Sequence, residues 1–524
     1  MRKLLLAALV LVGAPLAAQQ LDPMTNDKVA SYDWVRPQAD FVRREVMVPM
    51  RDGTKLFTVI VYRKGIKNAP ILLTRTPYDA GKATSRNRSQ KIEEVLPVMD
   101  APFVNDGYVR VYQDVRGLHG SEGDYVMTRP LSGPLNKTGI DHSTDAYDTI
   151  DWLVKNVPEA NGKVGIIGSS YLGFTSLMAL IDPHPALKAA VPQSPMVDGW
   201  IGDDWFHNGA FRTFGFDFAL EQTVKDGGGA VPKGTGDEYS AYLAHGSAAS
   251  FARAWGIDQL PSVRKMIEHP SYDQFWQEQA VDKLLAKRKL TVPTLVMLGQ
   301  WDQEDSYGAP AVYKAVKAAQ PDAPITLGIG PWRHSGANYE GYNLGPLKFE
   351  GDTALQFRMQ WIKPFLDCRL KANPSPCKAM PAAVTYATGA NRWETDERWP
   401  AGSEVPLYLG ADQGLSFQKP GAAGADSYVS DPANPVPFVP RPVRMEGDVW
   451  RNWLVQDQRF VEGRADVLSY TTPVLTESVQ IKGAPRVDLH AATSGADSDW
   501  VVKLIDVYPA EQTTPSGLPG YQLG

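Results

Sequence analysis

Short apolar runs recur through the first 334 residues and constrain the fold more than any other feature. Each run is rich in Val, Ile and Leu, and several end in Gly or Pro. They read PILLTRTPY, YVRVYQDVRG, KVGIIGSSY, LKAAVPQSP, TVPTLVMLGQWD and ITLGIGPWRH. Strands that are buried on both faces have this composition. We therefore predict an α/β fold with a mainly parallel sheet covered by helices, preceded by a hairpin in residues 44–63 that turns at Asp52-Gly53.

Two parts of the chain do not fit a simple crossover between parallel strands. A chain of 524 residues is long enough for about three domains. Residues 198–288 have a helical pattern, so we expect a helical cap inserted into a core domain of residues 19–197 and 289–380. The strand-like stretches VPLYLG, PRVDLHAATSG and DWVVKLIDVYP predict a separate β-sandwich over residues 381–524. The expected cap contains an aromatic cluster of Trp200, Trp205, Phe206, Phe211, Phe214, Phe216 and Phe218.

The N-terminal residues predict export. Arg2 and Lys3 precede an apolar run over residues 4–14, and small residues follow at Ala17 and Ala18. This is the layout of a signal peptide over residues 1–18, with an uncleaved anchor as the alternative. We expect a periplasmic or secreted protein with no other membrane segment. The net charge of −6 gives no basic face for nucleic acid and no polybasic membrane patch.

The chain contains two cysteines, Cys368 and Cys377. In an exported protein such a close pair could form a small disulfide loop, whereas two reduced, unrelated thiols are the alternative. A pair of cysteines without a nearby histidine cannot fill a zinc coordination shell. We expect no metal site here.

A serine flanked by glycines follows the run KVGIIG and precedes a helical stretch. The segment reads Gly168-Ser169-Ser170-Tyr171-Leu172-Gly173. This resembles the G-x-S-x-G nucleophile elbow in its strand–turn–helix context, although two residues here separate the serine from the second glycine. The alternative is an ordinary glycine-rich β–α turn. We predict that Ser170 is a nucleophile.

A serine hydroxyl needs an oriented base to remove its proton. With this elbow, an acid and then a histidine follow the nucleophile along the chain, each at a strand end. Asp302 follows TVPTLVMLGQW and His334 follows ITLGIGPWR, so both fit; Glu304 and Asp305 remain alternative acids. The other histidines precede or nearly adjoin the serine, or lie in the expected cap or β-sandwich: His119, His142, His184, His207, His245, His269 and His490.

Three acids within four positions, Asp302, Glu304 and Asp305, should repel one another. A solvated acidic loop explains them most simply from the residues alone. A Ca²⁺ site is a second explanation, because hard cations also bind clustered carboxylates.

Several longer motifs resemble the bacterial α-amino-acid ester hydrolases, which group with the cocaine-esterase-like and Xaa-Pro dipeptidyl-peptidase-like serine hydrolases. The matching stretches span nearly the whole chain after residue 18, and GDDWFH and WDQED are much more specific than the elbow. The stretches are RTPYDA at 75–80, QDVRG at 113–117, GSEGDY at 120–125, GSSYLGFT at 168–175, GDDWFH at 202–207, WDQED at 301–305, GPWRH at 330–334, WLVQDQRF at 453–460 and TSGADSDWVVKLIDVYP at 493–509.

The resemblance implies an α/β-hydrolase core, a helical cap and a C-terminal jelly roll, in a periplasmic homotetramer without a cofactor. Carried over by position, the triad is Ser170, Asp302 and His334. The implied oxyanion hole is formed by the backbone N–H of Tyr171 and the hydroxyl of Tyr78; a half-buried structural role is the alternative for that tyrosine.

The resemblance also implies that Asp204, Glu304 and Asp305 bind the α-ammonium group of the substrate. Trp205 and Phe206 could then wall an acyl side chain, or they could be cap core. The expected function is cleavage of α-amino-acid esters, and of amides such as β-lactam antibiotics, through an acyl-enzyme. The alternatives are an Xaa-Pro dipeptidyl-peptidase-like enzyme, a general carboxylesterase, or a binding module with a degenerate core.

Two departures from the family pattern stand out. Leu172 occupies a position where close relatives often carry Glu, which affects the pocket wall rather than the nucleophile. The jelly roll also continues in the family beyond residue 524, so we expect an incomplete C-terminal domain.

Overall fold

The computed structural model describes residues 22–28, 31–34, 37–202, 205–224, 229–399, 403–445, 447–509 and 522–523. The predicted signal peptide lies outside this range. Within the described residues, none of the helices combines the length and the hydropathy that a membrane span requires.

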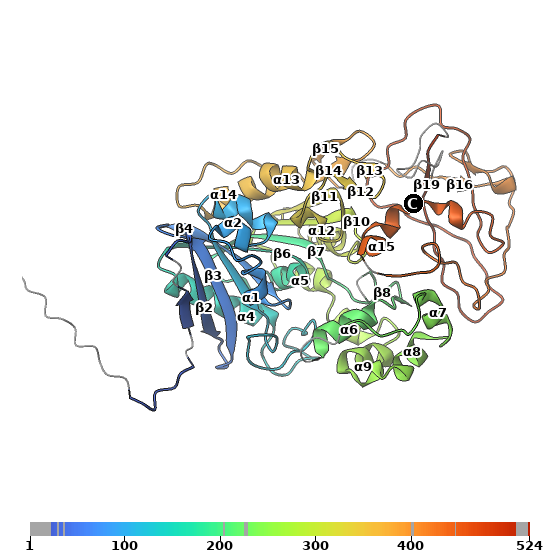
Figure 1. The fold of residues 1–524 in the computed structure, drawn as a ribbon. Helices are drawn as coiled ribbons and strands as arrows, with labels where there is room; N and C mark the ends of the chain where they lie inside the picture. The colour runs from blue at the N-terminus through green and yellow to red at the C-terminus, as the bar shows by residue number, and fades with distance from the viewer. Residues whose placement is uncertain are drawn as a thin grey trace, which may run out of the picture.

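A mixed sheet of 11 strands forms the centre of the molecule, in the order β1-β2-β3-β5-β4-β6-β7-β10-β11-β14-β15 (Figure 1). Neighbouring strands are parallel from β5 to β14 and antiparallel at both edges. The strands are β1 Ser31–Trp34, β2 Phe41–Pro49, β3 Lys55–Arg63, β4 Ala69–Thr76, β5 Val109–Asp114, β6 Ala160–Ser170, β7 Leu187–Pro195, β10 Thr294–Trp301, β11 Ile325–Arg333, β14 Ala383–Ala387 and β15 Arg392–Asp396. The predicted parallel sheet is confirmed, and the predicted hairpin is β2–β3.

Two hydrophobic cores cover the two faces of the sheet, because alternate strand residues point to opposite sides. Ile166 of β6 belongs to the core under α4, α5 and α12, whereas Ile167 belongs to the core under α3, α13 and α14. These helices are α3 Ala101–Val104, α4 His142–Asn156, α5 Tyr171–Met178, α12 Gly308–Ala319, α13 Thr353–Phe357 and α14 Lys363–Leu370. The central strands are therefore buried on both faces, which explains why most of their residues are apolar.

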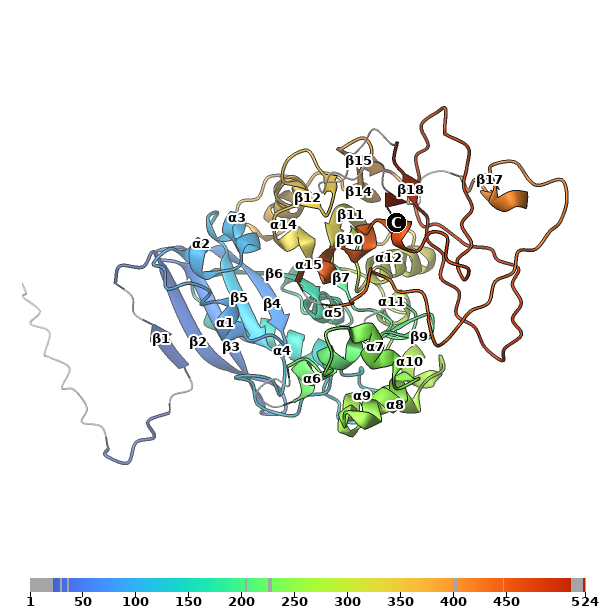
Figure 2. The same ribbon diagram turned by 45° about the vertical axis from the view of Figure 1, so that its right-hand side comes forward.

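After β7 the chain leaves the sheet, forms a group of helices, and returns to the sheet at β10. In Figures 1 and 2 the green helices of this insertion lie to one side of the sheet, and its last helix packs against α12. They are α6 Gly215–Thr223, α7 Glu238–Leu243, α8 Ala248–Ala254, α9 Pro261–Glu268, α10 Gln274–Gln277 and α11 Val281–Ala286. Trp205, Phe206, Phe216 and Phe218 are buried among them, so much of the aromatic cluster forms the core of this insertion.

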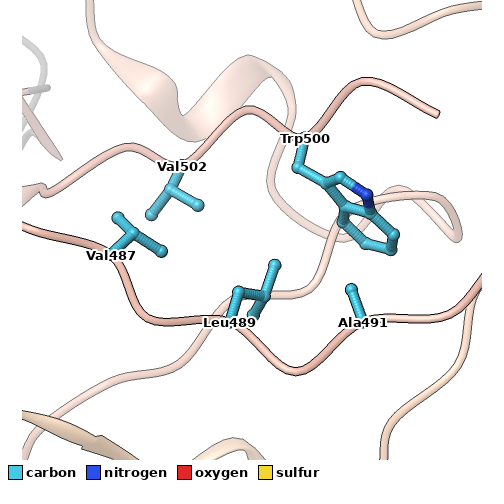
Figure 3. Close-up of a pocket in the computed structure, with 5 residues that line it drawn as sticks. All are labelled: Val487, Leu489, Ala491, Trp500 and Val502. Atoms are coloured by element: carbon cyan, nitrogen blue, oxygen red, sulfur yellow. The ribbon is translucent and has the colours of Figure 1, made fainter.

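The C-terminal part contains short strand pairs joined by long extended segments. The strands are β16 Tyr408–Leu409, β17 Leu415–Ser416, β18 Asp506–Val507 and β19 Gln522–Leu523. The predicted strand at PRVDLHAATSG has no ladder partner among the described residues, although its side chains still alternate. Val487, Leu489 and Ala491 face Trp500 and Val502 across an apolar pocket of about 500 Å³ (Figure 3).

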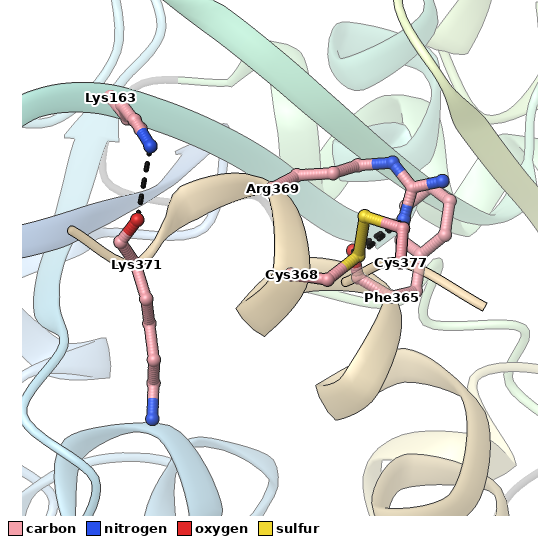
Figure 4. Close-up of a disulfide and its surroundings, with 6 residues drawn as sticks. All are labelled: Lys163, Phe365, Cys368, Arg369, Lys371 and Cys377. Carbon is pink, nitrogen blue, oxygen red and sulfur yellow. Dashed lines mark hydrogen bonds between the residues drawn. A yellow bond between two sulfur atoms is a disulfide. The ribbon is translucent and has the colours of Figure 1, made fainter. Parts of the chain in front are cut away.

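A disulfide joins Cys368 and Cys377 and closes the loop that follows α14 (Figure 4). The end of α14 is tied to the start of β6, because Lys163 donates to the carbonyl oxygen of Lys371 at 3.0 Å and Asn161 donates to that of Leu370 at 2.7 Å. These carbonyls lie at the helix end, where no further turn supplies an N–H donor. From the sequence alone, these two cysteines could be paired or reduced; the structure contains the disulfide.

Candidate active site

Ser170 is the last residue of β6 and the N-cap of α5, with φ 64° and ψ −127°. A serine in this region of φ is strained, and tight packing around the turn maintains it. Gly173 permits that packing, because a Cβ there would lie 2.4 Å from the carbonyl oxygen of Gln193 in β7. The strand–turn–helix geometry predicted around Ser170 is present.

His334 directly follows β11, and Asp302 directly follows β10, the neighbouring strand. The Nδ1 of His334 lies 2.8 Å from Oδ1 of Asp302, and both residues are buried. Burial opposes the charge on Asp302, but the charge and hydrogen bond of His334 outweigh it, so the pKa of Asp302 lies below its ordinary value. An ionised Asp302 can hold the imidazole with Nδ1–H facing it, which leaves Nε2 as the basic nitrogen.

Asp302 also folds the loop that carries the other two acids. Its Oδ1 accepts hydrogen bonds from the backbone N–H groups of Glu304 and Asp305, at 3.0 and 2.8 Å. Gln303 contacts the histidine instead: its Oε1 accepts a hydrogen bond from the backbone N–H of His334 at 2.9 Å. Gln303 was not predictable from the sequence, because nothing local distinguishes it from any polar loop residue.

Glu304 and Asp305 face the imidazole rather than bulk solvent. Oε2 of Glu304 lies 3.3 Å from Nε2 of His334, and Oδ2 of Asp305 lies 3.8 Å from Nδ1. Their side chains are 16% and 0% exposed. The solvated-loop interpretation of these acids is therefore wrong. No group of three or more His, Cys, Asp or Glu side chains within the described ranges is arranged to hold a metal ion.

The two residues expected at the oxyanion hole lie at the ends of β4 and β6. Tyr171 opens α5, where helix N–H groups have no acceptor within the helix. Tyr78 is 38% exposed, between β4 and the short helix α1 Ala80–Ala83.

Three hydrogen bonds fix the segment around Tyr78. Its own N–H donates to Oγ1 of Thr76 at 2.9 Å. Nε2 of His119 lies 2.8 Å from the carbonyl oxygen of Pro77. Oδ1 of Asp114, at the end of β5, accepts from the N–H of Ala80 at 2.6 Å. A phenol on such a fixed backbone suits a preorganised donor.

Asp204 lies outside the described residues, whereas Gly202 and Arg212, on either side of it in the sequence, contact Tyr307 and the acidic loop of residues 302–305, respectively. The backbone of Gly202 contacts Tyr307, since a Cβ at this glycine would lie 2.4 Å from Cβ of that tyrosine. Arg212 donates to the carbonyl oxygens of Gln303 and Glu304, at 2.7 and 3.2 Å. Trp205 and Phe206 are buried in the insertion, which agrees with their interpretation as cap core.

Further contacts at the site come from residues that the sequence did not indicate. Oγ of Ser169 lies 2.7 Å from Oγ of Ser335, which links the elbow to the residue after His334. A polar cavity of about 340 Å³ lies between the loop after β11 and the short helix α15 Gly447–Asn452. It is lined in part by Arg333 and Arg451.

Comparison with known proteins agrees with this geometry. Residues 52–336 match the X-Pro dipeptidyl-peptidase (S15) family. The chain belongs to this family. Residues 378–520 match the X-Pro dipeptidyl-peptidase C-terminal non-catalytic domain, so an S15 catalytic region with an α/β-hydrolase fold precedes a non-catalytic region that contains strands. Members of the S15 family are serine hydrolases, and this chain is an enzyme of that class.

Individual relatives of this S15 chain carry several activities. A solved structure described as an α-amino acid ester hydrolase is 54% identical, with a TM-score of 0.90 over 96% of this chain and 84% of that one. An aminopeptidase from a marine sediment archaeon, Thaumarchaeota archaeon, is 44% identical, with a TM-score of 0.88 over the same shares. Cocaine esterase of Rhodococcus sp. (strain MB1 Bresler) is 29% identical over 89% of this chain and 80% of the relative.

Proposed function

We propose that the protein hydrolyses esters of α-amino acids through an acyl-enzyme, and transfers the acyl group to amines such as a β-lactam nucleus. His334 removes the proton of Ser170, whose Oγ attacks the ester carbonyl. The backbone N–H of Tyr171 and the hydroxyl of Tyr78 stabilise the oxyanion. The alcohol leaves with the proton from His334, and water or an amine then attacks the acyl-enzyme.

The position of Glu304 and Asp305 beside the imidazole carries this proposal. A carboxylate 4 Å from an ammonium group attracts it by about 4 kcal/mol at an effective dielectric constant near 20. Acyl groups that are neutral or anionic at the α-carbon would leave these acids without a counter-charge. Asp204 completes the proposed ammonium site by the resemblance alone.

The test compares phenylglycine methyl ester with methyl phenylacetate, which lacks only the amino group. We expect kcat/KM to be at least about tenfold higher for the amino ester. Ser170→Ala should reduce kcat by at least about a thousandfold, and a fluorophosphonate probe should label the wild type but not this variant. Equal rates on the two esters would refute the ammonium site, whereas full activity of Ser170→Ala would refute the mechanism.

A second candidate function is aminopeptidase activity, which the 44% identical archaeal structure favours. Such an enzyme would use the same ammonium site but would expel an amine rather than an alcohol. Hydrolysis of phenylglycine methyl ester and of a peptide with an N-terminal phenylglycine, measured side by side, separates the two functions, and an Xaa-Pro peptide tests dipeptidyl-peptidase cleavage. We expect the ester to react faster.

We also infer that the enzyme acts in the periplasm or outside the cell. The sequence pattern of residues 1–18 supports export, and the Cys368–Cys377 disulfide is typical of oxidising compartments. Mass spectrometry of the purified protein tests this. A mature N-terminus near residue 19 is expected in the exported fraction, and protein found only in the cytoplasm with an intact Met1 would contradict it.

A further inference from the structure

One side chain from the C-terminal part of the chain reaches the acidic loop. Trp450, in α15, donates its indole N–H to Oε1 of Glu304 at 2.9 Å. The other oxygen of the same carboxylate, Oε2, lies 3.3 Å from Nε2 of His334. A single carboxylate therefore connects the C-terminal part to the imidazole.

Trp450 is itself held by the insertion between β7 and β10. Its ring stacks on Phe214, with ring centroids 4.1 Å apart and planes at 20°. The guanidinium of Arg212 lies 5.8 Å from the ring centroid of Trp450 while donating to the backbone of the acidic loop. The backbone and the side chain of Glu304 are thus fixed by different parts of the protein.

We propose that Trp450 is a positioning residue that holds the carboxylate of Glu304 in place to receive the substrate's ammonium group. A glutamate side chain has several rotatable bonds, and freezing them on binding costs conformational entropy. A charge-assisted hydrogen bond from a stacked indole freezes them beforehand. The C-terminal part then contributes to the choice of substrate without touching it. This inference rests on the proposed function, which assigns Glu304 to the ammonium site.

The test is Trp450→Phe, which keeps an aromatic ring that can stack on Phe214 but is smaller than the indole and has no N–H donor. The measured quantity is the ratio of kcat/KM for phenylglycine methyl ester to kcat/KM for methyl phenylacetate. We expect this ratio to fall about fivefold to tenfold, mainly through a higher KM for the amino ester.

Trp453→Phe is the matched control. Trp453 lies three residues further along, and its ring packs edge-on against Phe438 at 5.5 Å. In the described part of the chain its buried indole N–H has no acceptor. Replacing it should leave both rates within twofold of wild type.

A double-mutant cycle shows whether Trp450 acts through Glu304. Glu304→Gln should lower the ratio strongly, and adding Trp450→Phe to it should lower the ratio by less than twofold. If Trp450→Phe lowered the ratio as much in the Glu304→Gln background as in the wild type, the inference would be overturned, because Trp450 would then act independently of Glu304.

The two proposals fail in different ways. A wild-type ratio near one would overturn the proposed function and this inference together. If the wild-type ratio is above ten and Trp450→Phe leaves it unchanged, the inference is overturned but the proposed function stands. If Trp450→Phe does not fold, Phe214→Leu provides the second variant, because it removes the stack and keeps the donor. We expect it to lower the ratio about twofold to threefold, and an unchanged ratio would again overturn the inference.

Discussion

Asp302 combines a structural and a chemical task at one carboxylate. Its Oδ1 receives the backbone N–H groups of Glu304 and Asp305 as well as Nδ1 of His334. The geometry of the loop requires an oxygen at this position, whereas stabilising an imidazolium requires its negative charge. The two tasks can be separated by a substitution that keeps the oxygen and removes the charge.

We therefore predict that Asp302→Asn folds normally but reduces kcat by roughly 10²- to 10⁴-fold with little change in KM. The amide oxygen still accepts the loop N–H groups, but it stabilises His334 poorly once that residue takes the proton. Steady-state kinetics on phenylglycine methyl ester, with circular dichroism to confirm folding, provides the check. A variant that raised KM alone would show that Asp302 binds substrate rather than orienting the base.

We predict that the stability of the protein depends on pH through the buried carboxyl group of Asp114. Burial raises its pKa to about 6, despite hydrogen bonds from the N–H groups of Ala80 and Gly120. The unfolded chain releases this proton near pH 4. Between these two values the folded state holds a proton that the unfolded state has lost, so this residue's contribution to stability falls as the pH rises from about 4 to 6 and is level above that.

The measurement is the free energy of unfolding in urea for wild type and Asp114→Asn across pH 4 to 7. The wild-type value minus that of the variant should decrease by about 2–3 kcal/mol as the pH rises. A difference that stayed constant or increased would contradict the assignment.

At the scale of residues, the sequence predicted that Asp302 pairs with His334, and the structure confirms this contact; the role of Ser170 as the nucleophile stays a prediction. Ser170, Asp302 and His334 come from strand ends, and a parallel sheet brings the carboxyl ends of its strands to one edge. Trp450 was not predictable, because its partner Glu304 is 146 residues away and a tryptophan in GDVWRNW has no local signal. The sequence fixes neither the packing of the insertion nor that of the C-terminal part.

Among the elements, α14 and β6 show how a strand that carries the nucleophile is held at its far end. Asn161 and Lys163, near the start of β6, donate hydrogen bonds to the carbonyl oxygens of Leu370 and Lys371 at the end of α14, and the disulfide closes residues 368–377 into a loop. The sequence suggested these elements and their buried faces. It left the bridge open, because spacing alone does not bring two Cβ atoms within bonding range.

We predict that Cys368→Ser combined with Cys377→Ser lowers the free energy of unfolding by about 2–3 kcal/mol, the loop-closure contribution of a ring of about ten residues. Activity at 25 °C should remain within twofold of wild type, because the parallel sheet holds β6 along most of its length. Denaturant unfolding with and without dithiothreitol gives the measurement. The reductant should destabilise the wild type and not the variant; equal sensitivity of both would contradict the prediction.

In the molecule as a whole, segments that are far apart in sequence come together around His334 and the acidic loop beside it. The sheet edge supplies Ser170, Asp302 and His334; the insertion supplies Arg212; and the C-terminal part supplies Trp450. The layered sheet was predictable because strands that are buried on both faces consist mainly of Val, Ile and Leu. The strands of the C-terminal part were predicted less well, since alternating side chains indicate a facing pair of segments but not which backbones hydrogen-bond.

The adjacency of β7 and β10 has a consequence for how such an enzyme diversifies. These strands are paired in the sheet, with Ala190 opposite Thr294, yet about a hundred residues separate them along the chain. An entire insertion of different length or origin could be transplanted between them without altering the strand order, because its two attachment points already lie side by side. A foreign insertion would have to bring its own aromatic ring to stack on Trp450, and this requirement restricts which insertions would keep the proposed preference for amino esters.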